Sequence, residues 1–190
     1  MRLFVAFDLP AEVRQALGEL IAQLCPLCPK ARWVRSQSMH LTLKFLGHVD
    51  DQAEAQLAAI RSALAAVHSP APVEMQFRGV GFFPDARRPR VVWCGIDCSP
   101  NLVPLAKDID LALKPLGFPP EDRPFVPHLT LARLDAARGA AKLVRAAEQL
   151  TERSFGSARE SEFHLFQSIL RPSGAEYRKL QSYGFVKGAA

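Results

Sequence analysis

The tetrapeptide His-Leu-Thr-Leu occurs twice in this chain, as His40–Leu43 and as His128–Leu131. Both copies lie in stretches of alternating apolar residues, which is typical of β-strands. Successive side chains of a strand point to opposite faces, so each copy buries two leucines and presents a histidine beside a threonine on the other face. The chain has only three threonines, and two of them belong to these motifs. This distribution favours a functional site over a duplicated packing motif.

The two motifs are 88 residues apart (128 − 40), and the same offset relates the apolar stretches Arg2–Ala6 and Arg90–Cys94. This periodicity predicts an internal duplication with halves at about 1–85 and 88–171. In the first half, the patterning predicts helices at about 11–25 and 51–68 and strands at about 2–8, near Trp33, and at about 40–47 and 73–82. The second half repeats this order, with helices at about 101–116 and 136–153 and strands at about 90–97, 128–134 and 162–170. A last strand is expected at about 176–185.

Two β-α-β-α-β halves related by an approximate two-fold axis would place both motif strands beside one cleft. The predicted fold class is therefore α+β: a bilobal molecule of two pseudo-symmetric halves, with mostly antiparallel sheets facing a central cleft and helices outside. A chain of 190 residues without a long linker is expected to form a single bilobal domain over 1–190. Gly117, just after an apolar helical pattern, is the expected C-terminal cap of its helix.

Charge and hydrophobicity restrict the partners of the chain. The formal net charge is +5 and the sequence pI is about 9.3, which favours anionic partners such as nucleic acid. No apolar run approaches the roughly 18–20 residues of a membrane span, and the apolar N-terminal stretch is too short for a secretory signal. We therefore expect a monomeric cytoplasmic protein without a membrane partner.

Two further groups of residues each allow two interpretations. The basic turn Arg87–Arg90 is either a solvated loop or a contact to an RNA backbone. Trp33, Phe82 and Phe83 are either core residues, as most aromatic side chains are, or surfaces on which a base can stack. Their positions in the fold distinguish the alternatives.

Four cysteines form two close pairs, Cys25 with Cys28 and Cys94 with Cys98. A zinc site would join all four thiolates in one tetrahedral centre, but the second pair has an unusual spacing and falls within and just after an apolar strand. A redox pair normally opens a helix, whereas the first pair follows one. We therefore expect reduced thiols and a site without metal or cofactor. A metal-binding protein is the alternative.

Two histidines from facing strands can act as an acid and a base. In-line displacement at phosphorus needs a base on one side and an acid on the other. Imidazole titrates near pH 6.5, so one neutral and one protonated ring can coexist near neutrality. His40 and His128 are the predicted pair. Thr42 and Thr130 are predicted to donate hydrogen bonds to phosphate oxygens. These residues together indicate cleavage of a phosphate ester.

Two basic residues near the motifs are candidate substrate contacts. Lys44 is in phase with His40 and Thr42 along a regular strand, so it is predicted to face the cleft and attract phosphate. The alternative for Lys44 is a solvated charge at the strand end. Arg133 is out of phase with His128 and would need a bulge or a strand end to reach the site.

With their flanking residues, the two H-x-T-L motifs resemble the 2H phosphoesterase superfamily, and more narrowly the RNA 2′,3′-cyclic phosphodiesterases, also called 2′-5′ RNA ligases. One such motif alone would be weak, whereas the pair with these flanks is specific. The chain departs from the pattern at Phe166, near which relatives often carry a tyrosine. The resemblance covers almost the whole chain and is carried by Arg2–Ala6, Asp8–Pro10, Arg32–Val34, His40–Gly47, Arg88–Trp93, Arg123–Arg133 and Gly174–Tyr177.

The resemblance implies a bilobal fold with a cleft between the lobes, and hydrolysis of a terminal 2′,3′-cyclic phosphate of RNA to a 2′-phosphate. It implies that His40 donates a proton to the departing 3′ oxygen and that His128 accepts one from the attacking water. An arginine at the place of Arg133 is common in the family, which supports a substrate role for it. The same residues could run the reverse transesterification, so a 2′-5′ RNA ligase acting on tRNA-half-like ends is one alternative. A non-catalytic protein that binds RNA ends is another.

Overall fold

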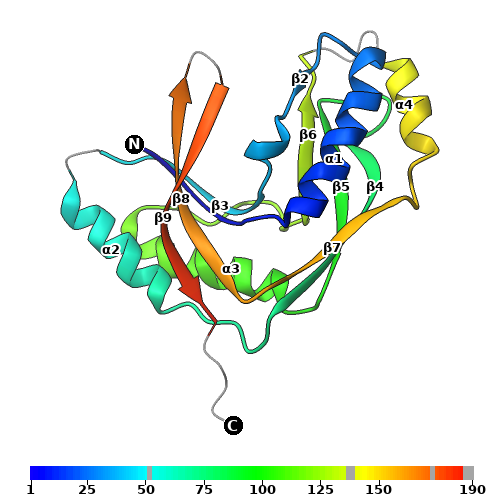
Figure 1. Cartoon of the computed structure of the whole chain (residues 1–190). Coiled ribbons are helices and arrows are strands. Elements are labelled where there is room, and N and C mark those ends of the chain that lie inside the picture. The colour runs from blue at the N-terminus through cyan, green and yellow to red at the C-terminus, as the bar shows by residue number, and fades with distance from the viewer. Residues whose placement is uncertain (51–52, 136–139, 172–173, 186–190) are drawn as a thin grey trace.

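The computed structural model describes residues 1–50, 53–135, 140–171 and 174–185, and it confirms the predicted α+β fold (Figure 1). Within these residues the strands form two antiparallel sheets. The first sheet has the strand order β3 (Leu41–His48), β1 (Arg2–Phe7), β8 (Glu162–Arg171) and β9 (Gly174–Gly184). The second sheet has the order β2 (Arg32–Trp33), β6 (His128–Arg133), β5 (Val91–Cys98), β4 (Val73–Phe83) and β7 (Ser154–Glu160).

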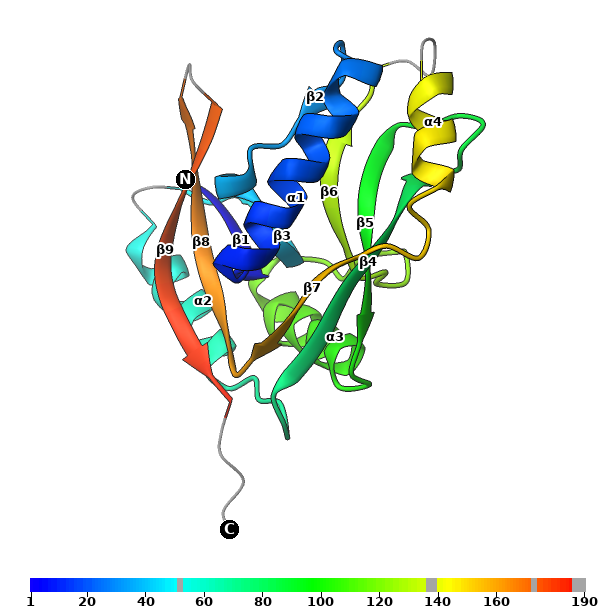
Figure 2. The same cartoon turned by 45° about the vertical axis from the view of Figure 1, so that its right-hand side comes forward.

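The helices pack against the sheets in two pairs (Figure 2). They are α1 (Ala11–Leu24), α2 (Glu54–Ala65), α3 (Leu102–Leu113) and α4 (Ala141–Glu148). Helix α1 contacts β7 and α4 contacts β4, whereas α2 contacts β9 and α3 contacts β3. The first pair therefore lies on the second sheet and the other pair on the first sheet. None of the described helices is long and apolar enough to cross a membrane.

The two sequence halves exchange their closing strands between the sheets. The 88-residue offset relates β1 to β5, β3 to β6 and β4 to β8. Each sheet contains three equivalent strands in the same order, β3-β1-β8 in the first and β6-β5-β4 in the second. Strand β4 of the first half thus lies in the second sheet, and β8 of the second half lies in the first. The sheets interleave the two sequence halves.

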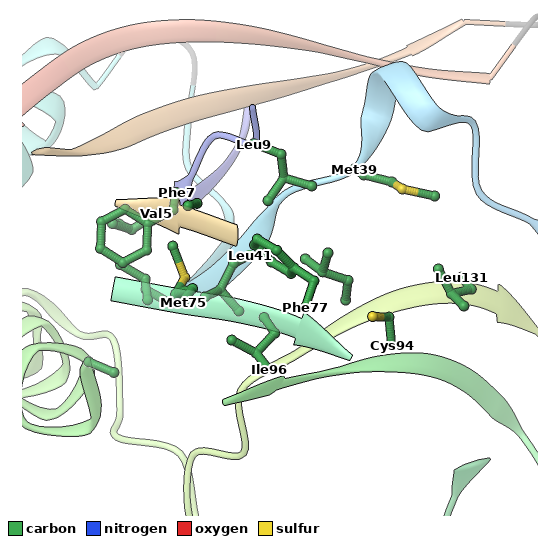
Figure 3. Packing of buried hydrophobic residues seen from close by; sticks show 14 of the residues in the cluster. Val5, Phe7, Leu9, Met39, Leu41, Met75, Phe77, Cys94, Ile96 and Leu131 are labelled. Carbon is green, nitrogen blue, oxygen red and sulfur yellow. The ribbon is translucent and has the colours of Figure 1, made fainter. Parts of the chain in front are cut away.

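One hydrophobic core joins the two sheets. Val5 of β1 and Leu41 of β3 lie beside Met75 and Phe77 of β4 (Figure 3), and all four are at most 1% exposed. The leucines of both motifs are buried as predicted, at positions 41, 43, 129 and 131. Because each motif strand places these leucines in the shared core, its other face is left for the cleft.

Two stretches differ from the prediction. The helix expected over 136–153 is shorter, because α4 spans Ala141–Glu148; residues 136–139 lie outside the described residues. The stretch Ser154–Glu160, for which no strand is predicted, forms β7 and pairs with β4. Only Phe155 and Ala158 of β7 are buried, so the strand has a weak pattern of its own. Its pairing with β4 stabilises the extended conformation, which the local sequence does not predict.

Gly117 confirms the predicted helix end. A short 3-10 turn, Lys114–Leu116, follows α3 and ends at Gly117. The φ angle of Gly117 is 89°, in the left-handed region that favours glycine. The glycine therefore stops the helical segment and lets the chain turn towards the second motif.

A β-bulge interrupts each motif strand at an equivalent residue. Consecutive residues of β1 pair with Thr42 and with Lys44, which makes Leu43 the extra residue of β3. The same shift in the pairing of β5 with β6 makes Leu131 the extra residue there. A bulge shifts the alternation of a strand by one residue. The duplicated bulge therefore decides which side chain after each motif faces the cleft.

Candidate active site

A pocket of about 500 Å³ lies between the two motif strands. His40 and Thr42 line it from the first sheet and its approach, and His128 and Thr130 line it from β6. Arg133 lines it as well. The structure thus brings together five of the six predicted site residues.

The two motif imidazoles are held by the same kind of hydrogen bond. Nδ1 of His40 lies 3.0 Å from the carbonyl oxygen of Ser38, and Nδ1 of His128 lies 2.8 Å from that of Val126. A carbonyl oxygen only accepts hydrogen bonds, so each Nδ1 carries a hydrogen and donates it. In the neutral ring the lone pair is then on Nε2. Each imidazole can therefore take up or release a proton through Nε2.

The ring of His40 lies in an aromatic enclosure. Its centroid is 4.5 Å from that of Phe4 and 4.9 Å from that of Tyr177, which meets it edge-on. Burial lowers the pKa of His40 to about 4, and the hydrogen bond to Ser38 and the charge of Asp8 oppose this shift only in part. In the free protein the imidazole is therefore neutral at neutral pH.

His128 has different neighbours, although its motif is identical. Phe83, at the end of β4, meets the ring of His128 edge-on with 4.9 Å between the centroids. Of the three aromatic residues with two interpretations, Phe83 thus lies at the site, whereas Trp33 and Phe82 pack against the core. The two motifs share the histidine and its hydrogen bond but not the surroundings of the ring.

The bulge in β6 brings Arg133 to the pocket. After the extra residue Leu131 the alternation shifts by one, so Arg133 turns to the same side as His128. In a regular strand Arg133 would point away from the pocket, so the bulge is what allows it to reach the site. Arg133 also lies near Tyr177: burial raises the pKa of this phenol, and the charge of Arg133 partly opposes the rise.

The equivalent bulge in β3 turns Lys44 away from the pocket. The prediction that Lys44 shares a face with the motif histidine and threonine is therefore wrong. The Lys44 side chain is buried, and its ammonium lies 2.7 Å from a carboxylate oxygen of Asp110 and 2.5 Å from the carbonyl oxygen of Pro119. These contacts tie β3 to α3 and to the loop that follows it. Phe45 lines the pocket in place of Lys44.

Sequence patterning missed three aromatic residues of the pocket, Phe4, Phe45 and Tyr177. Phe4 has the pattern of a core residue within an apolar strand. Phe45 is 58% exposed, because the bulge places it on the cleft side. Tyr177 reaches His40 only through the pairing of β9 with β8. The local sequence around Phe4 and Tyr177 does not indicate a place in the pocket. Phe45 could have been found only by recognising the bulge.

The cysteines and the basic turn lie outside the lining of this pocket. All four cysteines are free, and burial raises the pKa of the Cys94 thiol to about 12. Across the part of the chain that the structure describes, no group of three or more His, Cys, Asp and Glu side chains is placed to hold a metal ion. In the basic turn, the guanidinium of Arg90 donates to the carbonyl oxygen of Asp135.

Comparisons with known proteins show the family and the fold of the chain. The family model of the LigT-like phosphoesterases matches residues 7–93 and 96–177. An RNA 2′,3′-cyclic phosphodiesterase from Archaeoglobus fulgidus is 35% identical over 96% of this chain and 99% of the relative. The crystal structure of TT0787 from Thermus thermophilus has a TM-score of 0.77 and 30% identity, and both chains are covered fully. LigT of E. coli, crystallised with 3′-AMP, has a TM-score of 0.76 and 30% identity, with 98% of each chain covered.

Proposed function

The chain belongs to the LigT-like phosphoesterase family, and we propose that it hydrolyses RNA 2′,3′-cyclic phosphate ends to 2′-phosphate ends with two histidines as acid and base. The activity is supported by relatives such as the RNA 2′,3′-cyclic phosphodiesterase of Archaeoglobus fulgidus. One observation carries the mechanism: two imidazoles with Nδ1 bound to a backbone carbonyl line a single pocket from opposite sheets. This arrangement leaves an Nε2 atom on each side for the reacting phosphate.

In the proposed reaction His128 is the base and His40 is the acid. Nε2 of His128 takes a proton from water as the water oxygen bonds to phosphorus. The bond between phosphorus and the 3′ oxygen breaks, and Nε2 of His40 gives its proton to that oxygen. The products are a 2′-phosphate and a 3′-hydroxyl. Thr42, Thr130 and Arg133 would hold the non-bridging oxygens, where negative charge concentrates in the transition state.

The acid role requires that His40 carry a second proton when substrate is bound. Burial disfavours this proton in the free protein, since it lowers the pKa of His40 to about 4. A phosphodiester anion beside the ring favours the imidazolium and raises that pKa. We therefore infer that substrate binding is coupled to proton uptake by His40. Once formed, an imidazolium with a low intrinsic pKa releases its proton readily to the 3′ oxygen.

The test uses purified protein and an RNA with a 2′,3′-cyclic phosphate end, incubated with and without EDTA. We expect hydrolysis at equal rates in both and a 2′-phosphate as the dominant product, identified by phosphorus NMR. Loss of turnover with the chelator would contradict the metal-independent mechanism. A dominant 3′-phosphate would mean that the ribose lies reversed in the pocket, with the roles of the two histidines exchanged. Tight binding without turnover would indicate a protein that only binds RNA ends.

A further inference from the structure

The candidate active-site pocket is lined by two arginines. Arg2 reaches it from β1 and Arg133 from β6, and among the described residues no carboxylate lines it. A second pocket of about 430 Å³, on the second sheet, is different, because its Arg78 pairs with the carboxylates of Asp97 and Glu152. A nucleoside 2′,3′-cyclic phosphate carries one negative charge, which the guanidinium of Arg133 can match. Arg2 therefore adds a positive charge that one phosphate does not balance.

Arg2 lies in a row of polar side chains that crosses three strands of the first sheet. It pairs with His48 of β3 on one side and with Ser168 of β8 on the other. All three residues line the active-site pocket. A guanidinium, an imidazole and a hydroxyl can each donate a hydrogen bond to a phosphate oxygen. The row therefore has the chemistry of an anion site next to the motif residues.

A second bulge in β3 brings His48 into this row. Phe45 and Gly47 pair with consecutive residues of β1, which makes Leu46 an extra residue of β3. The φ angle of Gly47 is 75°, in the left-handed region that favours glycine. In a regular strand Phe45 and His48, three residues apart, would lie on opposite faces. Because of the bulge, both line the pocket.

The polar row lies one step along the sheet from the proposed acid. Phe4, the next residue on the same face of β1 after Arg2, packs against the ring of His40 with 4.5 Å between centroids. A strand rises by about 3.3 Å per residue, so Arg2 and Phe4 are about 7 Å apart along β1. The cyclic phosphate and the 5′ oxygen of one nucleotide are separated only by the ribose. With the cyclic phosphate at His40, a group on that 5′ oxygen is therefore within reach of the long side chain of Arg2.

We propose that Arg2, His48 and Ser168 bind a second phosphate of the substrate, the one carried by the 5′ oxygen of its terminal nucleotide. The inference rests on the proposed function and narrows its substrate class to nucleotides with a phosphate on both sides of the ribose. Two sources supply this chemistry: the last internucleotide linkage of an RNA end, and a free nucleotide with a 5′-phosphate and a 2′,3′-cyclic phosphate. A cyclic nucleotide with a 5′-hydroxyl leaves Arg2 without its anion.

Three substrates with the same terminal base test the site. They are adenosine 2′,3′-cyclic phosphate with a 5′-hydroxyl, the same compound with a 5′-phosphate, and a dinucleotide that ends in this cyclic phosphate. We expect kcat/KM to be at least about tenfold higher for a substrate with the second phosphate, because it gains a charge-assisted hydrogen bond. A gain for either phosphorylated substrate supports the site, and the larger gain identifies the source of the phosphate.

Variants assign the gain to residues. Arg2→Gln should lower the ratio of kcat/KM with and without the second phosphate by about tenfold. Arg2→Lys should retain part of it, since it keeps the charge but not the planar fork. His48→Ala and Ser168→Ala should lower the ratio by smaller factors. Arg145→Gln is the control, because Arg145 is exposed on α4 and lines neither pocket. Each ratio compares two substrates on one protein, so a smaller folded fraction cancels.

A binding measurement reads the same site without any chemistry. Adenosine 2′-phosphate and adenosine 2′,5′-bisphosphate differ only in the second phosphate, and calorimetry gives their dissociation constants. The bisphosphate should bind about tenfold more tightly at low salt. This preference should shrink when the salt concentration is raised, because the site is open to solvent and its charges are screened. It should also shrink in Arg2→Gln.

The two proposals fail in different ways. A preference for the bisphosphate that depends on Arg2, without cleavage of any cyclic phosphate, would contradict the proposed function and support the second phosphate site. Cleavage of all three substrates with equal kcat/KM would leave the proposed function standing and overturn the site. A gain for the dinucleotide that survives Arg2→Gln would come from its upstream nucleoside and would equally overturn the inference.

Discussion

Phe45 and Arg133 occupy equivalent places in the two motif strands, each five residues after its motif histidine and each turned towards the pocket by a bulge. The duplicated backbone therefore presents an aromatic ring from the first sheet and a guanidinium from the second. A guanidinium can make a bidentate contact with a phosphate, which a phenyl ring cannot. The equivalent positions of the two motif strands thus differ chemically, with a phenyl ring on the strand of Thr42 and a guanidinium on the strand of His128.

We expect Arg133→Gln to lower kcat/KM for a nucleoside 2′,3′-cyclic phosphate by about tenfold or more, which corresponds to about 1.4 kcal/mol of transition-state stabilisation. Arg133→Lys should lose less, because it keeps the charge but not the planar fork. Arg145→Gln is the control, because Arg145 is exposed on α4 and does not line the pocket, so the variant removes the same charge outside the site. Steady-state kinetics of the three variants measure the effect, and equal values for Arg133→Gln and the control would remove Arg133 from the site.

Lys44 should act on stability and not on kinetics. Lys44→Met leaves Asp110 without the ammonium that lies 2.7 Å away in the native protein. Removal of one partner of a buried ion pair costs about 3–5 kcal/mol, and the partial exposure of Asp110 reduces this to about 2–3 kcal/mol. Urea unfolding should show the loss, while kcat/KM of the folded variant stays within about twofold of the native value. A stable variant with impaired kinetics would restore the substrate role that the regular strand predicts.

The different outcomes for Lys44 and Arg133 show where sequence patterning stops. A two-residue alternation is enough to predict that both motifs lie in strands and that His40 and Thr42 share a face. The alternation fails after each extra leucine, because a bulge is fixed by the pairing of β3 with β1 and of β6 with β5 and not by the motif strand itself. Arg133 was therefore in phase and Lys44 out of phase, the reverse of the expectation for regular strands.

The remaining differences have the same physical origin. Strand β7 has few buried residues and is ordered by β4, and the exchange of β4 and β8 between sheets joins segments that are distant in sequence. Tyr177 reaches the pocket through one such pairing. Helices α1 and α3, whose apolar residues recur with helical spacing, were predictable within a few residues. Local periodicity therefore predicts the helices and most of the strands. Pairing between segments that are distant in sequence determines which further residues, such as Tyr177, complete the site.

The histidines should be separately required. His40→Ala and His128→Ala are each expected to lower turnover by at least about 10², since each removes one proton-transfer group. His68→Ala is the matched control, because His68 is exposed and lines neither pocket. Circular dichroism should confirm that the variants fold. A folded single variant with near-normal turnover would exclude that histidine from the mechanism.

The motif threonines offer a test that separates hydroxyl from shape. Thr42→Val and Thr130→Val keep the β-branched side chain but delete the donor, and each should lower kcat/KM by about tenfold or more because the lost bond is strongest in the transition state. Thr→Ser at the same positions keeps the hydroxyl and should recover most of the activity. If valine and serine variants behave alike, the hydroxyls do not contact the phosphate.

The burial of His40 predicts different pH profiles for the free protein and for its substrate complex. The kcat/KM profile reports groups of the free protein. Its lower limb should have an apparent pKa near 4, the value to which burial lowers the pKa of His40, whereas two unperturbed histidines would place both limbs near 6.5. The kcat profile reports the complex, in which the phosphate anion raises the pKa of the imidazolium. The lower limb of kcat should therefore lie at higher pH than that of kcat/KM.

Proton NMR can follow the same group directly. The ring protons of His40, assigned by their absence in His40→Gln, should titrate with a midpoint of about 4 in the free protein and at higher pH once a 2′-nucleotide product is bound. Because the unfolded chain binds this proton more readily than the folded one, folding stability should also fall as the pH drops from about 6.5 to about 4. A midpoint that product binding leaves in place would contradict coupled proton uptake, since an anion beside the ring must favour its charged form.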